Sequence, residues 1–181
     1  MDALMIILLL IILFIAAVWL YIARQGDAEF VFLVEEHTPW IVEDLDDRSV
    51  TFTAKVPFIN KGRQGGTIMD AYTRHLLPCE QYDAVTVQSQ LTSEAMFRTD
   101  GYWESVIFTP NEGGRAIVTV KLTAKEGTIQ AAMTDMVNMP VEIVYQIVAR
   151  SDWYITKNRL LFVAEEAREA LKNKLAAVQG E

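Results

Sequence analysis

His75 and Cys79 are the two residues in this sequence whose types and spacing could support chemistry. A histidine can activate a nucleophilic cysteine, and the same two side chains can bind zinc. Four residues apart, they would share one face of a helix. Pro78 argues against a helix there, and the sequence offers only one further histidine, His37, and no second cysteine. We therefore predict no catalytic, metal-binding or cofactor-binding residue and expect that the protein is not an enzyme.

Two other segments contain residue types that occur in ligand sites. The acidic residues 43–47 could offer oxygen ligands to calcium, but the spacing of an EF-hand is absent. The glycine-rich residues 60–66 carry Lys61 and Arg63 but lack the GxxxxGK[ST] pattern of a phosphate-binding loop. Both segments are therefore predicted to be turns.

An enzyme or small-ligand binder with a site dispersed along the sequence is the alternative. A pocket that brings His75 together with a carboxylate, with a shifted pKa, would favour this alternative. The residues to inspect for such a site are His75, Asp70, Arg74 and Glu104.

Several large aromatic residues lie near the ends of predicted strands. Aromatic side chains at such positions often fill the ends of a β-sandwich. They could instead form a patch that recognises a peptide or a carbohydrate. The candidate patch consists of Trp103, Trp153 and Tyr102.

The element that would position any site is an apolar run at the N-terminus. Residues 3–23 contain no charge, amide, glycine or proline, and a helix of that length reaches about 31 Å, enough to cross a bilayer. Trp19, Tyr21 and Arg24 suit the membrane interface. A cleaved signal peptide is the alternative, but the basic start and the cleavage site are missing. We predict that residues 1–23 are a single-pass signal anchor whose partner, through residues 3–23, is the lipid bilayer.

The side of the membrane depends on a single basic residue. No Lys or Arg precedes the apolar run, whereas Arg24 follows it directly. Because basic residues gather on the cytoplasmic side, we expect a cytoplasmic domain, with an extracytoplasmic one as the alternative. Only one cysteine and no N-glycosylation acceptor are present, which favours a bacterial protein.

The charge of the remaining chain excludes one class of partner. Residues 24–181 contain 16 basic and 23 acidic residues, a net charge of −7. Nucleic acids are polyanions and bind basic surfaces. We therefore expect no nucleic-acid partner.

Alternating hydrophobicity after a short linker, residues 24–29, predicts β-strands. In residues 49–60 every second residue is apolar, and residues 83–92, 115–124 and 137–150 repeat this pattern. Such alternation is typical of half-buried strands. We predict a mainly β domain over residues 30–158, an antiparallel β-sandwich of the Ig or fibronectin type with about seven or eight strands. Residues 102–108 and 115–124 would form a hairpin, and a small barrel is the alternative fold.

The pattern changes to helical spacing near the C-terminus. Residues 159–181 are predicted to form a helix and tail, although residues 159–163 could be a last strand. One face is apolar, and it can pack on its own sandwich or on a partner helix. That face consists of Leu160, Ala164, Ala167, Leu171, Leu175 and Val178.

A β-sandwich held at the membrane and lacking a catalytic motif is typical of an interaction module. We therefore expect this protein to recruit or organise a protein partner, of unknown identity, next to the membrane.

Overall fold

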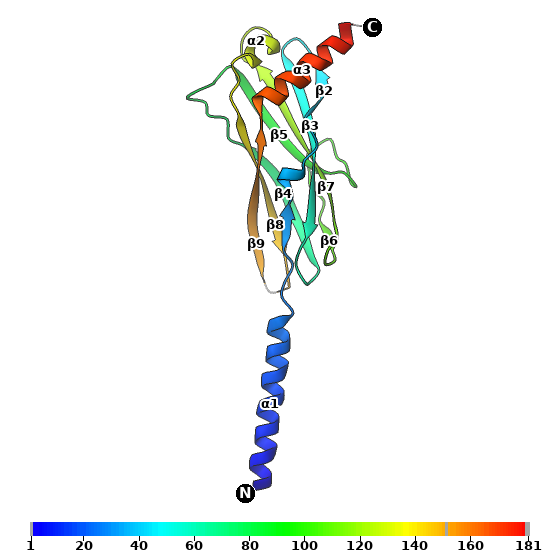
Figure 1. Cartoon of the computed structure of the whole chain (residues 1–181), viewed down its shortest axis with the longest axis vertical. Helices are drawn as coiled ribbons and strands as arrows, with labels where there is room; N and C mark the ends of the chain where they lie inside the picture. The colour runs from blue at the N-terminus through cyan, green and yellow to red at the C-terminus, as the bar shows by residue number, and fades with distance from the viewer. Residues whose placement is uncertain (1, 151, 180–181) are drawn as a thin grey trace.

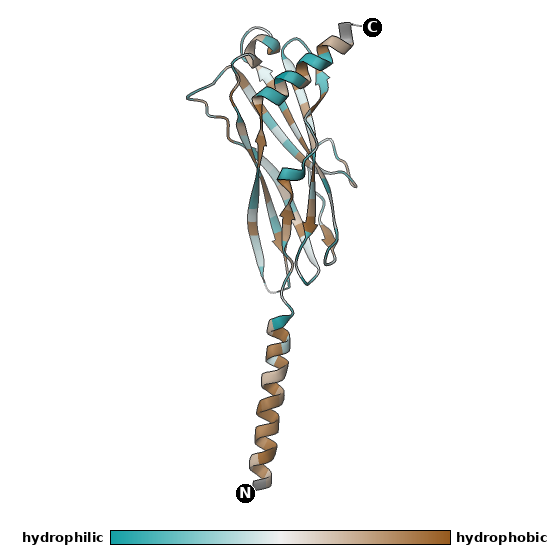
Figure 2. Ribbon diagram, viewed as in Figure 1, coloured by the Kyte–Doolittle hydropathy of each residue, from teal (hydrophilic) through white to brown (hydrophobic). Residues whose placement is uncertain are grey.

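A computed structural model of the chain describes residues 2–150 and 152–179, without the side chains of residues 2, 178 and 179. The helix α1 (Asp2–Arg24) extends from one end of an elongated β domain, and α3 (Ala164–Gln179) lies at the opposite end (Figure 1). Figure 2 shows that α1 is apolar along most of its length and hydrophilic only at the end next to the β domain. Its length and composition would allow residues 3–24 to cross a membrane, features that a signal sequence shares.

The β domain is a sandwich of two antiparallel sheets. Sheet A has the order β1-β3-β7-β5, with β2 also paired to β3, and sheet B has the order β6-β4-β8-β9. The prediction of a mainly β antiparallel sandwich is therefore confirmed, with nine strands in the described chain. The strands of sheet A are β1 (Phe30–Phe32), β2 (Ile41–Leu45), β3 (Ser49–Asn60), β5 (Val85–Ser93) and β7 (Gly113–Ala124). Those of sheet B are β4 (Gly66–His75), β6 (Val106–Phe108), β8 (Met139–Val148) and β9 (Trp153–Phe162).

Alternation along the strands decides which side chains fill the core. In β3 the apolar residues on one face are almost completely buried, and the intervening residues face outward, as a period of two requires. The neighbouring strand β7 repeats this pattern in register, with Ala54 opposite Val118. The buried residues of β3 in this pattern are Val50, Phe52, Ala54, Val56 and Phe58.

The predicted hairpin of residues 102–108 and 115–124 is wrong. β6 pairs with β4 in sheet B, whereas β7 lies in sheet A between β3 and β5. The glycine-rich residues 60–66 likewise cross from β3 in sheet A to β4 in sheet B. Hydrophobic alternation shows which face of a strand is buried, but the strand it pairs with depends on contacts made across the whole domain.

The last strand is longer than the sequence indicated. β9 runs to Phe162, so the segment from residue 159 begins as a strand, and the helix α3 starts only at Ala164. The inward side of β9 breaks the apolar pattern because it includes Asn158. The Asn158 Oδ1 accepts hydrogen bonds from the Phe32 N–H (3.1 Å) and from the Tyr145 hydroxyl (2.7 Å). These hydrogen bonds satisfy a partly buried polar side chain and join β9 to β1.

The C-terminal helix packs on its own sandwich. Ala164, Ala167 and Leu171 are buried, and the Ala164 N–H donates to the Asn138 Oδ1 (2.9 Å). The predicted apolar face therefore packs on the β-sandwich of the same chain. The Val178 side chain lies outside the described residues. Two short helical segments, η1 (Val34–Glu36) and α2 (Ile129–Met133), complete the fold.

Candidate functional site

The residues considered for chemistry are not gathered into one site. His75 ends β4 and is half-buried, and burial lowers the pKa of its imidazole. Cys79 is exposed in the following loop, where its Sγ lies 3.5 Å from the Leu77 carbonyl. The described residues contain no group of three or more His, Cys, Asp or Glu that could hold a metal ion.

The charged residues considered with His75 lie elsewhere. Asp70 and Arg74 are exposed on β4, in register with Gln146 and Glu142 of β8. Glu104 accepts a hydrogen bond from the Arg98 guanidinium (3.1 Å) in the loop between β5 and β6. Nothing in this placement supports acid–base chemistry at His75.

The three aromatic residues of the predicted recognition patch have different environments. Trp153 and Tyr102 are exposed, at 60% and 56%. Trp103 is only 1% exposed, and its ring packs against Phe32 and Phe58 with centroid distances of 6.3 and 5.8 Å. Trp103 therefore belongs to the core and cannot contact a partner, which corrects the expectation for that residue.

A groove on the outer face of sheet A is the best candidate for a binding site, and we call it groove A. It has a volume of about 610 Å³, within the range of roughly 300–1,000 Å³ typical of ligand sites. Apolar and charged side chains both line it. The lining residues are Thr38, Pro39, Ile41, Glu43, Thr53, Ala54, Lys55, Phe97, Arg115 and Ile117.

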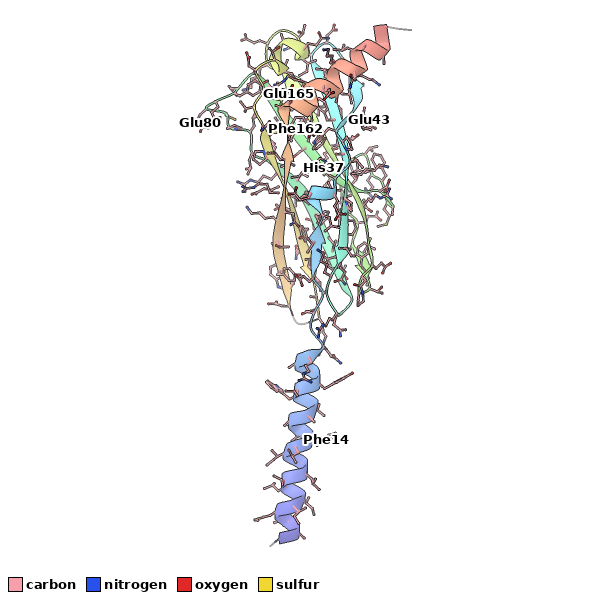
Figure 3. All side chains as sticks on the ribbon, viewed as in Figure 1. Phe14, His37, Glu43, Glu80, Phe162 and Glu165 are labelled. Carbon is pink, nitrogen blue, oxygen red and sulfur yellow. The ribbon has the colours of Figure 1, made fainter. Side chains whose placement is uncertain are left out.

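One wall of groove A is the segment that leads into β2. The Thr38 N–H donates to the Lys55 carbonyl, and the Lys55 N–H donates to the Thr38 Oγ1, both at 2.9 Å. Ile41 lies opposite Thr53 of β3, and its side chain is 61% exposed. The backbone of this wall is thus fixed to the sheet while its apolar side chain remains free for contact. Figure 3 shows Glu43 farther along the same strand.

The other wall is the loop between β5 and β6, which is anchored in the core by one residue and braced by contacts within the loop. The buried Trp103 anchors it in the core. The Arg98 guanidinium donates two hydrogen bonds to the Asp100 carboxylate (3.0 and 2.6 Å) and lies 5.1 Å from the centre of the Tyr102 ring. Arg98 lowers the pKa of Asp100 to about 2. A loop ordered in this way can present Phe97, which is 57% exposed, over the groove.

Groove A contains both signs of charge. Glu94, at the end of the loop wall, accepts a hydrogen bond from the Lys55 Nζ (2.6 Å), and the Arg115 Nη1 lies 3.6 Å from its other oxygen. The Lys55 hydrogen bond is the main cause of the lowered pKa of Glu94. Because these groups are partly exposed, their ion pairs contribute little to stability. Lys55 and Arg115 thus lie beside the apolar walls, partly exposed and paired with Glu94.

Sequence reasoning missed the residues of groove A because they come from four separate segments. The one signal that could have found them is Phe97, a phenylalanine within the polar stretch of residues 92–101. A large apolar side chain between strands either anchors a loop in the core or is exposed for contact.

His37 lies in a second, smaller cleft of about 430 Å³, between the segment before β2 and the helix α3. Its Nδ1 is 2.7 Å from the Thr38 carbonyl. Figure 3 shows His37 beside η1, on the body of the domain and below α3. The cleft is also lined by Glu166 and Glu169 and includes neither His75 nor Cys79. His37 therefore shares the cleft with the Glu166 and Glu169 carboxylates, and the residues that line the cleft include no Cys, Ser or Thr.

An ion cluster lies on the outer face of sheet B. Glu142 of β8 is buried, and its Oε1 accepts hydrogen bonds from the Lys157 Nζ (2.6 Å) and the Arg159 Nη2 (3.1 Å) of β9. Lys157 and then Arg159 lower the pKa of Glu142. The cluster satisfies a carboxylate that could not otherwise be buried at low cost.

Glu142 predicts a specific pH dependence of stability. A carboxyl group with a lowered folded pKa stabilises the fold above its ordinary value of 4.5, and this contribution is lost as the pH falls through the folded pKa. We expect Glu142→Gln to lower the urea midpoint at neutral pH, because two cations lose their counter-charge. The variant should then lose less stability than the unchanged protein on acidification below that value. Parallel losses in the two proteins would contradict this role for Glu142.

No family model matches this chain, and no curated protein matches it. Among solved structures it is similar to the GAE domain of GGA2p from Saccharomyces cerevisiae (TM-score 0.36, 8% identity, covering 75% of this chain and 96% of that one). It is also similar to the yeast GGA1 GAE domain (0.32, 6%, 70% and 98%) and to a protein from Archaeoglobus fulgidus (0.32, 8%, 74% and 97%). At TM-scores below 0.5 and identities of 8% or less, these similarities assign no function to this chain.

Proposed function

We propose that this protein is a membrane-tethered interaction module that binds an extended segment of a protein partner in groove A. The observation that carries the proposal is the pairing of two exposed apolar side chains, Ile41 and Phe97, across a groove with fixed walls. Apolar side chains that are more than half exposed suit contact with a second protein surface. A small molecule, by contrast, usually has 70–90% of its surface buried in its pocket.

The chemistry of groove A indicates what the partner segment contains. Apolar side chains would pack between Ile41 and Phe97, and carboxylates or backbone carbonyls would accept hydrogen bonds from Lys55 and Arg115. An ordered groove also lowers the entropic cost of binding, because its walls need not be arranged by the ligand.

The test is a selection of displayed random peptides on the full chain held in lipid nanodiscs. We expect the selected peptides to lose about tenfold or more in affinity for Ile41→Asp. Ile155→Asp is the matched control, because Ile155 is 60% exposed on sheet B and Ile41 is 61% exposed on sheet A. Selected peptides that bind Ile41→Asp as well as the unchanged protein would reject groove A as the site.

The membrane tether is the second part of the proposal. The apolar helix α1 would cross the bilayer once, with Trp19, Tyr21 and Arg24 at the interface next to the β domain. All three side chains are exposed, as they would need to be in contact with lipid. Arg24, the first basic residue after the apolar run, supports a domain on the cytoplasmic side.

Cys79 allows the orientation to be tested without introducing a new thiol. It is exposed and is the only cysteine of the chain. We expect a membrane-impermeant maleimide to label the protein only after cells are lysed, with Cys79→Ser as the unlabelled control. Labelling of intact cells would place the domain outside the cytoplasm.

A further inference from the structure

The end of the β domain next to α1 is joined to that helix without a free linker. We call this end the foot: residues 24–29 together with the β3–β4 turn, the β6–β7 turn and the described residues 149, 150 and 152 between β8 and β9 (Figure 1). The Arg63 Nη1 donates to the Arg24 carbonyl and the Gln64 Nε2 to the Gln25 carbonyl, both at 3.4 Å. The Arg150 N–H donates to the Asp27 Oδ1 (2.8 Å). The helix end and the turns are therefore held at a fixed separation.

The packing between the linker and the β3–β4 turn is close. Gly62 lies against the Asp27 carbonyl, so that any side chain at this position would overlap it. The Lys61 N–H also donates to the Glu29 carbonyl (2.7 Å). Residues 27–29 thus belong to the domain, and only two residues separate this fixed segment from the last residue of α1.

An exposed apolar row crosses the outer face of sheet B at the foot. Four residues lie in register across its strands: Ile107, Thr67, Val148 and Trp153. Ile107 is 71% exposed, Trp153 60% and Val148 40%. Trp153 lies only three residues from Arg150, which is bonded to the linker. The row therefore lies at the end of sheet B that faces α1.

The charge of the foot differs from that of the rest of the domain. Four cations there match four carboxylates, so the net charge of the foot is zero, whereas residues 24–181 together carry −7. An anionic lipid surface would repel the body of the domain but not the foot. The charged residues of the foot are Arg24, Lys61, Arg63, Arg150, Asp27, Glu29, Glu112 and Asp152.

We propose that the foot rests on the headgroup layer of the bilayer that α1 crosses, with Ile107, Val148 and Trp153 inserted at the interface. This inference rests on the proposed tether and adds a second lipid contact, made by the β domain itself. The headgroup layer is about 5–7 Å thick on each side, and tryptophan favours that region. The contact holds the domain upright, so that groove A stands at a set height above the membrane.

The test places a fluorescent label at two heights on the same face of the full chain in nanodiscs. In a Cys79→Ser background, Ile107→Cys carries the label in the apolar row, and Leu161→Cys carries it at the far end of β9. Trp153 and Leu161 are eight residues apart along β9, about 27 Å. We expect lipids with a nitroxide on the headgroup to remove most of the emission at position 107 and none at position 161. Adding Trp153→Asp should restore the emission at position 107.

A third label separates this proposal from the proposed tether. Phe14→Cys lies in the middle of α1 (Figure 3), where nitroxides on the lipid tails should quench it if the helix crosses the bilayer. Quenching at position 14 without quenching at position 107 would overturn the foot contact and leave the tether intact. No quenching at position 14 would overturn the tether. A label at position 107 that is shielded from aqueous iodide but not quenched by lipid would indicate a protein on this row and also reject the proposal.

Discussion

Replacing Trp103 with alanine is expected to destabilise the β domain by about 3–5 kcal/mol, the usual cost of removing a large aromatic side chain from a core. Trp103 is 1% exposed and packs against the rings of Phe32 and Phe58. The surrounding strands cannot collapse fully into the space, because each strand is held in place by hydrogen bonds to its neighbours in the same sheet. Urea unfolding of the full chain, followed by circular dichroism, measures the loss.

The matched control for this prediction is Trp153→Ala. It removes the same side chain from a position that is 60% exposed, so we expect a change of about 0.5 kcal/mol or less. Equal losses in the two variants would contradict the core position of Trp103. Peptides selected on groove A should also bind Trp103→Ala more weakly than Trp153→Ala, because Trp103 anchors the loop that carries Phe97.

Asn60→Ala is expected to cost about 2–4 kcal/mol, because it leaves several buried or partly buried backbone groups without partners. Asn60 is fully buried. Its Oδ1 accepts hydrogen bonds from the Glu29 and Gly62 N–H groups, both at 3.0 Å. Its Nδ2 donates to the Gln64 carbonyl (2.9 Å) and also approaches two carbonyls of the β6–β7 side. One side chain therefore links the linker to two turns of the foot.

Hydrogen exchange can distinguish this role from a general loss of packing. In Asn60→Ala the amides of residues 27–32 should exchange faster than those of β8, because the linker loses its attachment before the core opens. Asn60→Asp, which keeps the acceptor but loses the hydrogen bonds that Nδ2 donates, should protect the Glu29 amide better than Asn60→Ala. Uniform acceleration across the domain would mean that Asn60 acts only through global stability.

Some errors in the sequence-based reading have a common cause. Trp103 and Trp153 both lie beside polar residues near strand ends, yet one is buried and the other exposed. β9 was only partly recognised because Asn158 takes an inward position, where the pattern expects an apolar residue. In both cases the environment of the residue is set by segments distant in the sequence: Phe32 and Phe58 for Trp103, and β1 for Asn158.

Groove A could not be found from the sequence for the same reason. Ile41, Lys55, Phe97 and Ile117 belong to four segments and meet only because β2 and β7 pair with β3 and the β5–β6 loop is anchored above them. Neither local composition nor periodicity shows that these four segments lie side by side in the fold.

The sequence by itself determined the features that depend on local pattern. Unbroken apolar composition predicts the helix α1, and alternation predicts the buried face of β3, because a strand turns successive side chains to opposite sides. Only the tertiary structure decided which strands pair, which tryptophan is buried and where groove A and the foot lie. These features depend on contacts between residues tens of positions apart, whose free energy is gained only when the two sheets close on one core.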